Sequence, residues 1–181
     1  DMLERFRREV TLMRGFSHPH ILKVFDYRED TDNQLALISM EYVEGGTVWD
    51  LLDLARQRQA QVPLVLSLQI LLQALEALTE AHAKEIVHRD ISPGNILLAG
   101  GSSQDLLRDP LRNPGVKLLD FGIAGLVDKI RRSQEGAGLG TASYAAPEVF
   151  HPEEKVTPAI DIYSLGAVVW ELTTGHMPTV S

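Results

Sequence analysis

Residues 157–175 constrain the fold of this chain most strongly. Thr157-Pro158 carries the residue types that begin a helix, and Gly175 is the type that ends one. The predicted helix is apolar on almost every side, with Ile160, Ile162, Leu165, Val168, Val169, Trp170 and Leu172. Such a helix belongs inside a domain rather than on its surface. Asp161 is costly there unless it is paired, so we expect this carboxylate to accept structural hydrogen bonds.

The first third of the chain predicts a helix, a hairpin and a second helix. Residues 3–14 place apolar side chains three and four residues apart, which is typical of one helical face. Residues 21–27 and 35–42 are rich in strand-forming types, and the polar residues between them favour a turn. Gly45-Gly46 is then expected to break the chain before a helix over residues 48–58.

A longer helix is predicted from Pro63 as far as His82. Its apolar face is expected to be formed by leucines, namely Leu64, Leu68, Leu71, Leu72, Leu75 and Leu78. Residues 116–119 form another strand candidate. Residues 99–115 are rich in Gly, Ser, Asp and Pro and predict a surface insertion, and residues 125–147 predict a loop without periodicity.

Charge and composition exclude several kinds of function. The 181 residues contain 17 Lys and Arg against 25 Asp and Glu, a net charge of -8, which argues against nucleic acid as a partner. The chain has no cysteine, so neither a disulfide framework nor a thiolate metal site can form. The most hydrophobic stretches, 64–78 and 158–174, are interrupted by charged and amide side chains. We therefore expect soluble core helices and no membrane segment.

The residues that carry chemistry lie in two short segments, 88–95 and 120–122. Asp90 lies in a polar loop, where a carboxylate can accept a proton from a hydroxyl group. Asn95 offers a hard oxygen ligand, and Asp120 at the end of a predicted strand offers a charged one. A single Asp is more often a turn or capping residue. The combination fits phosphoryl transfer, which depends on positioning and metal ions.

These segments resemble the protein kinase family, and the resemblance runs over essentially the whole chain. The matching motifs are His88-Arg89-Asp90-Ile91-Ser92-Pro93-Gly94-Asn95 for the catalytic loop, Asp120-Phe121-Gly122 for the metal-binding loop and Ala146-Pro147-Glu148 for the end of the activation segment. The resemblance is to the Hanks-type Ser/Thr kinases of bacteria. It implies an α+β, two-lobed fold running from helix C to helix F. Residues 1–42 would form the end of the N-lobe and the hinge, and residues 43–181 part of the C-lobe.

The same resemblance assigns roles to individual residues. Asp90 would be the base, Asn95 and Asp120 would hold Mg²⁺, and Glu9 would pair with the strand-three lysine. The ATP-binding residues would be Met40, Glu41, Val43, Leu97 and Asp120. The residues expected to stack as a spine are Met13, Val24, His88 and Phe121, and Asp161 would anchor the catalytic loop. The Gly-rich loop and the strand-three lysine are expected outside this chain, so the isolated fragment is expected to be inactive.

Ser92 is the main departure from the family pattern. Most Ser/Thr kinases have lysine at this position, where an ammonium group helps to neutralise the transferring phosphate. Because Ser92 cannot supply charge, we expect a working but slow catalyst. Two alternatives stay open, a pseudokinase that acts as a scaffold or binding module and a small-molecule phosphotransferase.

The activation segment predicts the substrate class and a switch. Thr141 lies in a pattern similar to that of Ser/Thr kinases, and the catalytic loop lacks the arginines of tyrosine kinases. Arg89 can clamp a phosphate with two hydrogen bonds, and Ser133 is the first candidate for phosphorylation, followed by Thr141 and Ser143. The resemblance implies a protein substrate, a dimer that phosphorylates itself in trans, and a cytoplasmic location.

Overall fold

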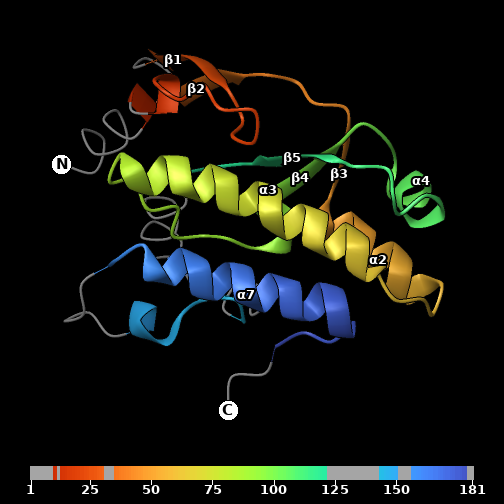
Figure 1. Ribbon diagram of the computed structural model, residues 1–181. Helices are drawn as coiled ribbons and strands as arrows, with labels where there is room; N and C mark the ends of the chain where they lie inside the picture. Colours follow the sequence, from red (N-terminus) through yellow and green to blue (C-terminus); the bar gives the residue numbers. More distant parts are fainter. Residues whose placement is uncertain (1–9, 12, 31–34, 122–142, 151–155, 179–181) are drawn as a thin grey trace.

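The computed structural model describes residues 10–11, 13–30, 35–121, 143–150 and 156–178. The elements in chain order are β1 (Val24–Asp30), β2 (Leu35–Met40), β3 (Gly45–Thr47), α2 (Val48–Gln57), α3 (Leu64–Ala83), β4 (Ile96–Ala99), α4 (Ser103–Arg108), β5 (Gly115–Leu118) and α7 (Ala159–Thr174). Short 3₁₀ turns lie at Pro93–Asn95 and Pro147–Phe150. Figure 1 shows the β1–β2 hairpin above a layer of long helices. This arrangement agrees with the predicted α+β class.

The predicted hairpin is present, with shifted ends. β1 and β2 pair antiparallel from Val24 with Met40 to Asp30 with Leu35. Asp30 was expected in the turn but belongs to β1, and β2 ends at Met40 rather than at Tyr42. The backbone ladder extends over polar residues because pairing with a partner strand outweighs the weak strand preference of a single side chain.

A second sheet, β3–β4–β5, is antiparallel throughout. The prediction that Gly45-Gly46 breaks the chain is wrong, because both glycines lie in β3 and pair with Ala99 and Leu98. A Cβ atom on Gly45 would lie 2.0 Å from the carbonyl oxygen of Leu98. Glycine is therefore needed here because the two backbones approach too closely for any side chain.

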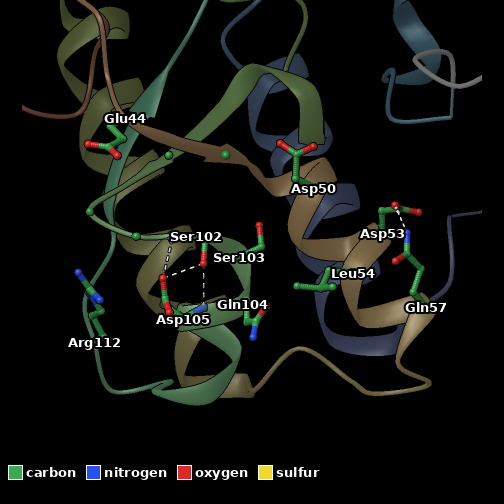
Figure 2. A pocket seen from close by; sticks show the side chains of 14 residues that line it. Glu44, Asp50, Asp53, Leu54, Gln57, Ser102, Ser103, Gln104, Asp105 and Arg112 are labelled. Carbon is green, nitrogen blue, oxygen red and sulfur yellow. Dashed lines mark hydrogen bonds between the residues drawn. The ribbon is translucent and has the colours of Figure 1, made fainter.

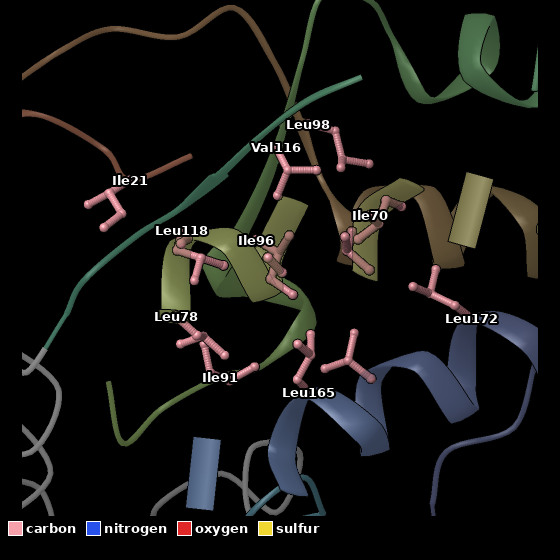
Figure 3. Packing of buried hydrophobic residues seen from close by; sticks show 14 of the residues in the cluster. Ile21, Ile70, Leu78, Ile91, Ile96, Leu98, Val116, Leu118, Leu165 and Leu172 are labelled. Atoms are coloured by element: carbon pink, nitrogen blue, oxygen red, sulfur yellow. The ribbon is translucent and has the colours of Figure 1, made fainter. Parts of the chain in front are cut away.

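The core lies between this sheet and the two longest helices. α3 and α7 run side by side in Figure 1, and Figure 3 shows that side chains of β4, β5, α3 and α7 meet in one cluster. Its members include Ile70, Leu78, Ile96, Leu118, Leu165 and Leu172. Both predicted helices are therefore core elements.

The predicted helix from Pro63 is confirmed as α3, but its predicted leucine face is only partly the buried one. Leu78 is buried, and Leu71 and Leu75 pack partly buried against the core. Leu64, Leu68 and Leu72 stay exposed by 62%, 45% and 60%. The fully buried side is formed by Leu66, Ile70, Ala74, Ala77, Leu78 and Ala81. Alanines at the contact allow neighbouring elements to pack closely, so shape complementarity rather than the number of leucines selects the face.

By length and composition, α3 is apolar enough to cross a membrane. The expectation that residues 64–78 are too polar to do so is therefore not supported by composition. Core helices of globular domains pass the same test, and 44% of the most apolar window of α3 is buried. Its packing against the sheet and α7 agrees with a role as a core helix.

α7 ends as predicted but is not enclosed on all sides. Gly175 is its C-cap in the left-handed conformation, with φ of 74°, which glycine adopts at little cost. Its fully buried apolar side chains include Leu165, Val168 and Leu172. Ile162 and Trp170 are exposed, so the described part of the chain covers one face of this helix.

Residues 99–115 contain a helix that the sequence analysis did not predict. α4 begins with a capping box, in which Ser102 and Asp105 exchange hydrogen bonds, and its Leu106 is fully buried. The buried amide of Gln73 on α3 holds the end of the insertion by donating to the Pro114 carbonyl at 2.9 Å. The insertion is thus packed onto the domain.

A cavity of about 1050 Å³ lies between α2 and α4. Figure 2 shows the side chains that line it. Asp50, Asp53 and Asp105 line it together with Arg112. Asp50 and Asp105 serve as capping residues of α2 and α4, which explains their positions. None of its lining residues is a candidate catalytic residue, so the cavity is separate from the site described next.

Candidate active site

The carboxylate of Asp161 holds the loop that contains Asp90. Asp161 is fully buried on α7. Its Oδ2 accepts hydrogen bonds from the backbone N–H of His88 at 2.8 Å and from His82 Nε2 at 2.8 Å. Its Oδ1 accepts from the backbone N–H of Arg89 at 2.8 Å. The predicted anchoring role of Asp161 is therefore confirmed, and His82 is a partner that the sequence analysis missed.

The backbone of the anchored loop is strained at Arg89. Arg89 has φ of 69°, a left-handed conformation that costs about 1–3 kcal/mol for a residue with a side chain. Burial lowers the pKa of His88 below its ordinary value, so its ring is neutral. The ring donates from Nε2 to the Leu119 carbonyl at 2.7 Å and accepts at Nδ1 from the Asp90 N–H at 3.3 Å. These bonds compensate for the strained backbone.

Asp90 and Asn95 are joined directly across the loop. Asn95 Nδ2 donates to the Asp90 carbonyl oxygen at 2.7 Å and to its carboxylate Oδ2 at 2.8 Å. Both bonds use the amide nitrogen, so neither consumes the amide oxygen. Ser92, between them, is largely buried and carries no charge. The two polar side chains are therefore held in a fixed relation at the partly exposed side of the loop.

Asn95 and Asp120 lie at the same end of the sheet. β4 pairs with β5 through Ile96 and Leu118, and the Leu119 N–H donates to the Asn95 carbonyl at 3.0 Å. Asp120 has φ of 55°, a second strained residue. Among the described residues, no group of three or more His, Asp or Glu side chains could hold a metal. An Asn–Asp oxygen pair fits Mg²⁺, which is usually bound by one or two side chains together with phosphate.

Phe121 joins this site to the core. Its ring centroid lies 4.5 Å from that of His88, which confirms their predicted contact. The ring of Phe16 also stacks on Phe121, with the centroids 5.7 Å apart, and the sequence analysis did not name this neighbour. Met13 and Val24 are buried in the same cluster. Their direct stacking on Phe121 stays a prediction.

The residues predicted to contact adenine lie on three neighbouring segments. Met40 ends β2, Glu41 and Val43 follow in the connection to β3, and Leu97 lies on β4 with its side chain half-buried. Glu41 points its carboxylate to Lys117 on β5, at 2.7 Å. This partner was not predicted, because 76 residues separate the two in sequence. Glu9, Ser133 and Thr141 lie outside the described residues.

A buried cluster near the end of the activation segment was also missed. Glu171 on α7 is fully buried and accepts hydrogen bonds from the Tyr144 hydroxyl and from the Arg56 guanidinium. Burial, and secondarily the hydrogen bond to Glu171, raises the pKa of Tyr144 well above its ordinary value. The cluster ties α2, α7 and the segment before Pro147 together.

Replacing Tyr144 with phenylalanine in the complete protein is expected to lower the free energy of unfolding by about 1–3 kcal/mol, because one oxygen of buried Glu171 loses its donor. Urea denaturation measures this. The control is Tyr163→Phe on α7, the helix that carries Glu171. Because Tyr163 is exposed, this substitution should change the free energy of unfolding by less than about 0.5 kcal/mol. Equal stability of the two variants would show that the hydroxyl is not needed.

Comparison with known proteins shows the family to which this chain belongs. A family model described as "Protein kinase domain" matches residues 1–181. The serine/threonine-protein kinase PknA of Corynebacterium glutamicum is 36% identical over 181 residues, covering 98% of this chain and 35% of that protein. PknA of Mycobacterium tuberculosis is 37% identical, with 98% and 38% covered. PknB of Mycobacterium leprae is 34% identical, with 97% and 26% covered.

A solved structure agrees with the sequence relatives. The crystal structure of Rad53 residues 1–466 in complex with AMP-PNP matches with a TM-score of 0.71 and 29% identity, covering 98% of this chain and 40% of that one. The chain spans at most 38% of the length of the three relatives compared above. On the strength of the family match and of the anchored loop with its Asp and Asn side chains, this chain belongs to the protein kinase domain family.

Proposed function

We propose that the complete protein is a Ser/Thr protein kinase that transfers the γ-phosphate of ATP to protein hydroxyl groups. The observation that carries the proposal is the loop held by Asp161, in which Asp90 and Asn95 are bonded to each other beside the strand that ends at Asp120. Relatives named as serine/threonine-protein kinases over almost the whole of this chain support the same reaction.

In this proposal Asp90 orients the acceptor hydroxyl and takes its proton while the oxygen bonds to the γ-phosphorus and the bond to the leaving ADP breaks. Asn95 Oδ1 and the Asp120 carboxylate would hold Mg²⁺, which when bound neutralises phosphate charge. Ser92 contributes no charge, so a slow rate is expected.

The nucleotide would lie between the hinge and β4. Met40, Glu41 and Val43 would border the adenine, and Leu97 would lie beneath it. The Rad53 structure, solved with AMP-PNP, supports a nucleotide in this family. Glu9 would pair with a lysine supplied by another part of the protein. The domain would lie in the cytoplasm, where ATP is available. Residues 1–42 would belong to the N-lobe and the hinge, and residues 43–181 to the C-lobe.

Regulation would act on the activation segment. Arg89 follows anchored His88 and is exposed, so its guanidinium is available to a phosphate on Ser133 or Thr141. A dimer would allow one copy to phosphorylate the other. Mass spectrometry of the complete protein after incubation with ATP tests this switch, and a fully active but unmodified segment would reject it.

The test of the function is phosphate transfer by the complete protein. Incubation with γ-labelled ATP and Mg²⁺ should label Ser and Thr in a protein acceptor and leave Tyr unlabelled, and EDTA should abolish the reaction because phosphoryl transfer depends on the metal. Binding of Mg-ATP without transfer would favour the pseudokinase. Labelling of small-molecule acceptors in place of protein would favour the small-molecule phosphotransferase.

A further inference from the structure

Glu41 is held by both its backbone and its side chain. Its N–H donates to the Lys23 carbonyl at 2.9 Å. Its Oε1 accepts from the Lys23 backbone N–H at 2.8 Å and from Lys117 Nζ at 2.7 Å. The side chains of Glu41 and Lys117 are only 24% and 19% exposed. This segment after β2 is therefore fixed to β5 by a partly buried ion pair.

The same connection is reinforced by the backbone of residues 20–23. The Leu22 N–H donates to the Leu118 carbonyl at 3.0 Å, and the Leu118 N–H donates to the His20 carbonyl at 2.9 Å. Lys117 and Leu118 belong to β5, whose chain continues directly to Asp120. Residues 20–23, Glu41 and β5 thus form one hydrogen-bonded unit that ends at the proposed metal ligand.

Lys117 also lies beside the proposed floor of the nucleotide site. In the β4–β5 ladder it pairs directly with Leu97, so the two side chains occupy the same face of the sheet. Burial on its own raises the pKa of Glu41, but the hydrogen bonds from Lys117 and Lys23 outweigh it and bring the pKa below its ordinary value. The Glu41 carboxylate therefore favours its charged form beside Lys117.

We propose that Glu41 and Lys117 are positioning residues that set the hinge relative to Leu97 and Asp120, and so determine the affinity for Mg-ATP. This inference rests on the proposed kinase function. The pair does not touch the reacting atoms in this proposal, so it governs nucleotide binding more than the rate of transfer. Loss of either charge breaks the direct ion pair between Glu41 and β5 and leaves only the indirect backbone connection through residues 20–23.

The test uses Lys117→Met and Glu41→Gln in the complete protein. Each variant should raise the KM and the directly measured Kd for Mg-ATP by about tenfold, a size typical of coupling between contacting residues, and should change kcat less than about twofold. The double variant should be no worse than either single one, and Lys117→Arg should restore part of the affinity. Arg28→Met is the control. It breaks an exposed Arg28–Asp26 ion pair on β1 and should leave the KM and the Kd for Mg-ATP unchanged.

Unchanged affinity, additive effects in the double variant, or an increase in kcat would overturn the positioning role. The two readouts separate this inference from the proposed function. If the unmodified protein binds Mg-ATP without transferring phosphate, the kinase proposal fails and the Kd values still decide the role of the pair. If it does neither, both proposals are rejected.

Discussion

Replacing Asp161 with alanine in the complete protein will abolish measurable phosphate transfer and lower the free energy of unfolding by about 3–5 kcal/mol, the cost of removing one partner from a buried polar network. Asp161 is fully buried and receives hydrogen bonds from His88, Arg89 and His82. Without it, two backbone N–H groups lose their acceptor, and the left-handed conformation of Arg89 loses its support.

Asp161→Asn separates folding from function. Asparagine keeps the size of the side chain but presents an NH₂ group to one of the donors, so we expect a smaller loss of stability with a large loss of activity. Asp53→Ala, at an exposed position of α2, is the control and should shift stability by less than about 0.5 kcal/mol. Urea denaturation and labelled-ATP transfer measure the two effects. An Asp161→Ala variant as stable and active as the control would refute the anchoring role.

Asp90→Asn is expected to reduce kcat by about 10²–10⁴-fold, the usual contribution of a general base. In the unmodified protein, Asn95 Nδ2 donates to the Asp90 carboxylate at 2.8 Å, and the side-chain oxygen of an asparagine at position 90 can still accept this hydrogen bond. The loop should therefore keep its geometry, and the variant should unfold at the same urea concentration as the unmodified protein. It loses the negative charge that accepts the proton.

Binding measurements distinguish a chemical role of Asp90 from a structural one. The Kd for Mg-ATP should stay within about twofold for Asp90→Asn, because Asp90 acts on the acceptor hydroxyl and not on the nucleotide. Asp53→Asn serves as the matched substitution at a site away from the loop. Retention of more than a tenth of the activity by Asp90→Asn would assign the base to another residue.

Local sequence patterns predicted much of this fold. Gly175 ends α7 because a residue without a Cβ adopts the left-handed conformation readily, and the two strand-forming runs pair as a hairpin. The need of Asp161 for partners also follows from sequence, since a carboxylate in an apolar helix must be compensated. What the pattern does not contain is the identity of a distant partner such as His82, 79 residues away.

The errors have the same origin. The leucine stripe of α3 predicts the buried face only in part, because the fit of Ala74, Ala77 and Ala81 against neighbouring elements turns the helix so that half of the leucines are exposed. From the sequence, Gly45-Gly46 was expected to interrupt regular secondary structure. The structure places both residues in β3, where β4 approaches so closely that Gly45 leaves no room for a side chain. Each outcome depends on which surfaces meet after the chain has folded.

The segments 88–95, 120–122 and 146–148 were enough to recognise the protein kinase family by resemblance, and the apolar stretch 157–175 predicted a core helix. They are short-range patterns, whose spacing is fixed by the covalent chain. Only the tertiary structure decided which face of that helix is buried and how Asp161 holds the loop. The same is true of the pairing of Glu41 with Lys117 and of Glu171 with Tyr144. Hydrogen bonds and packing between residues far apart in sequence depend on exact distances in space, which no local pattern of residue types encodes.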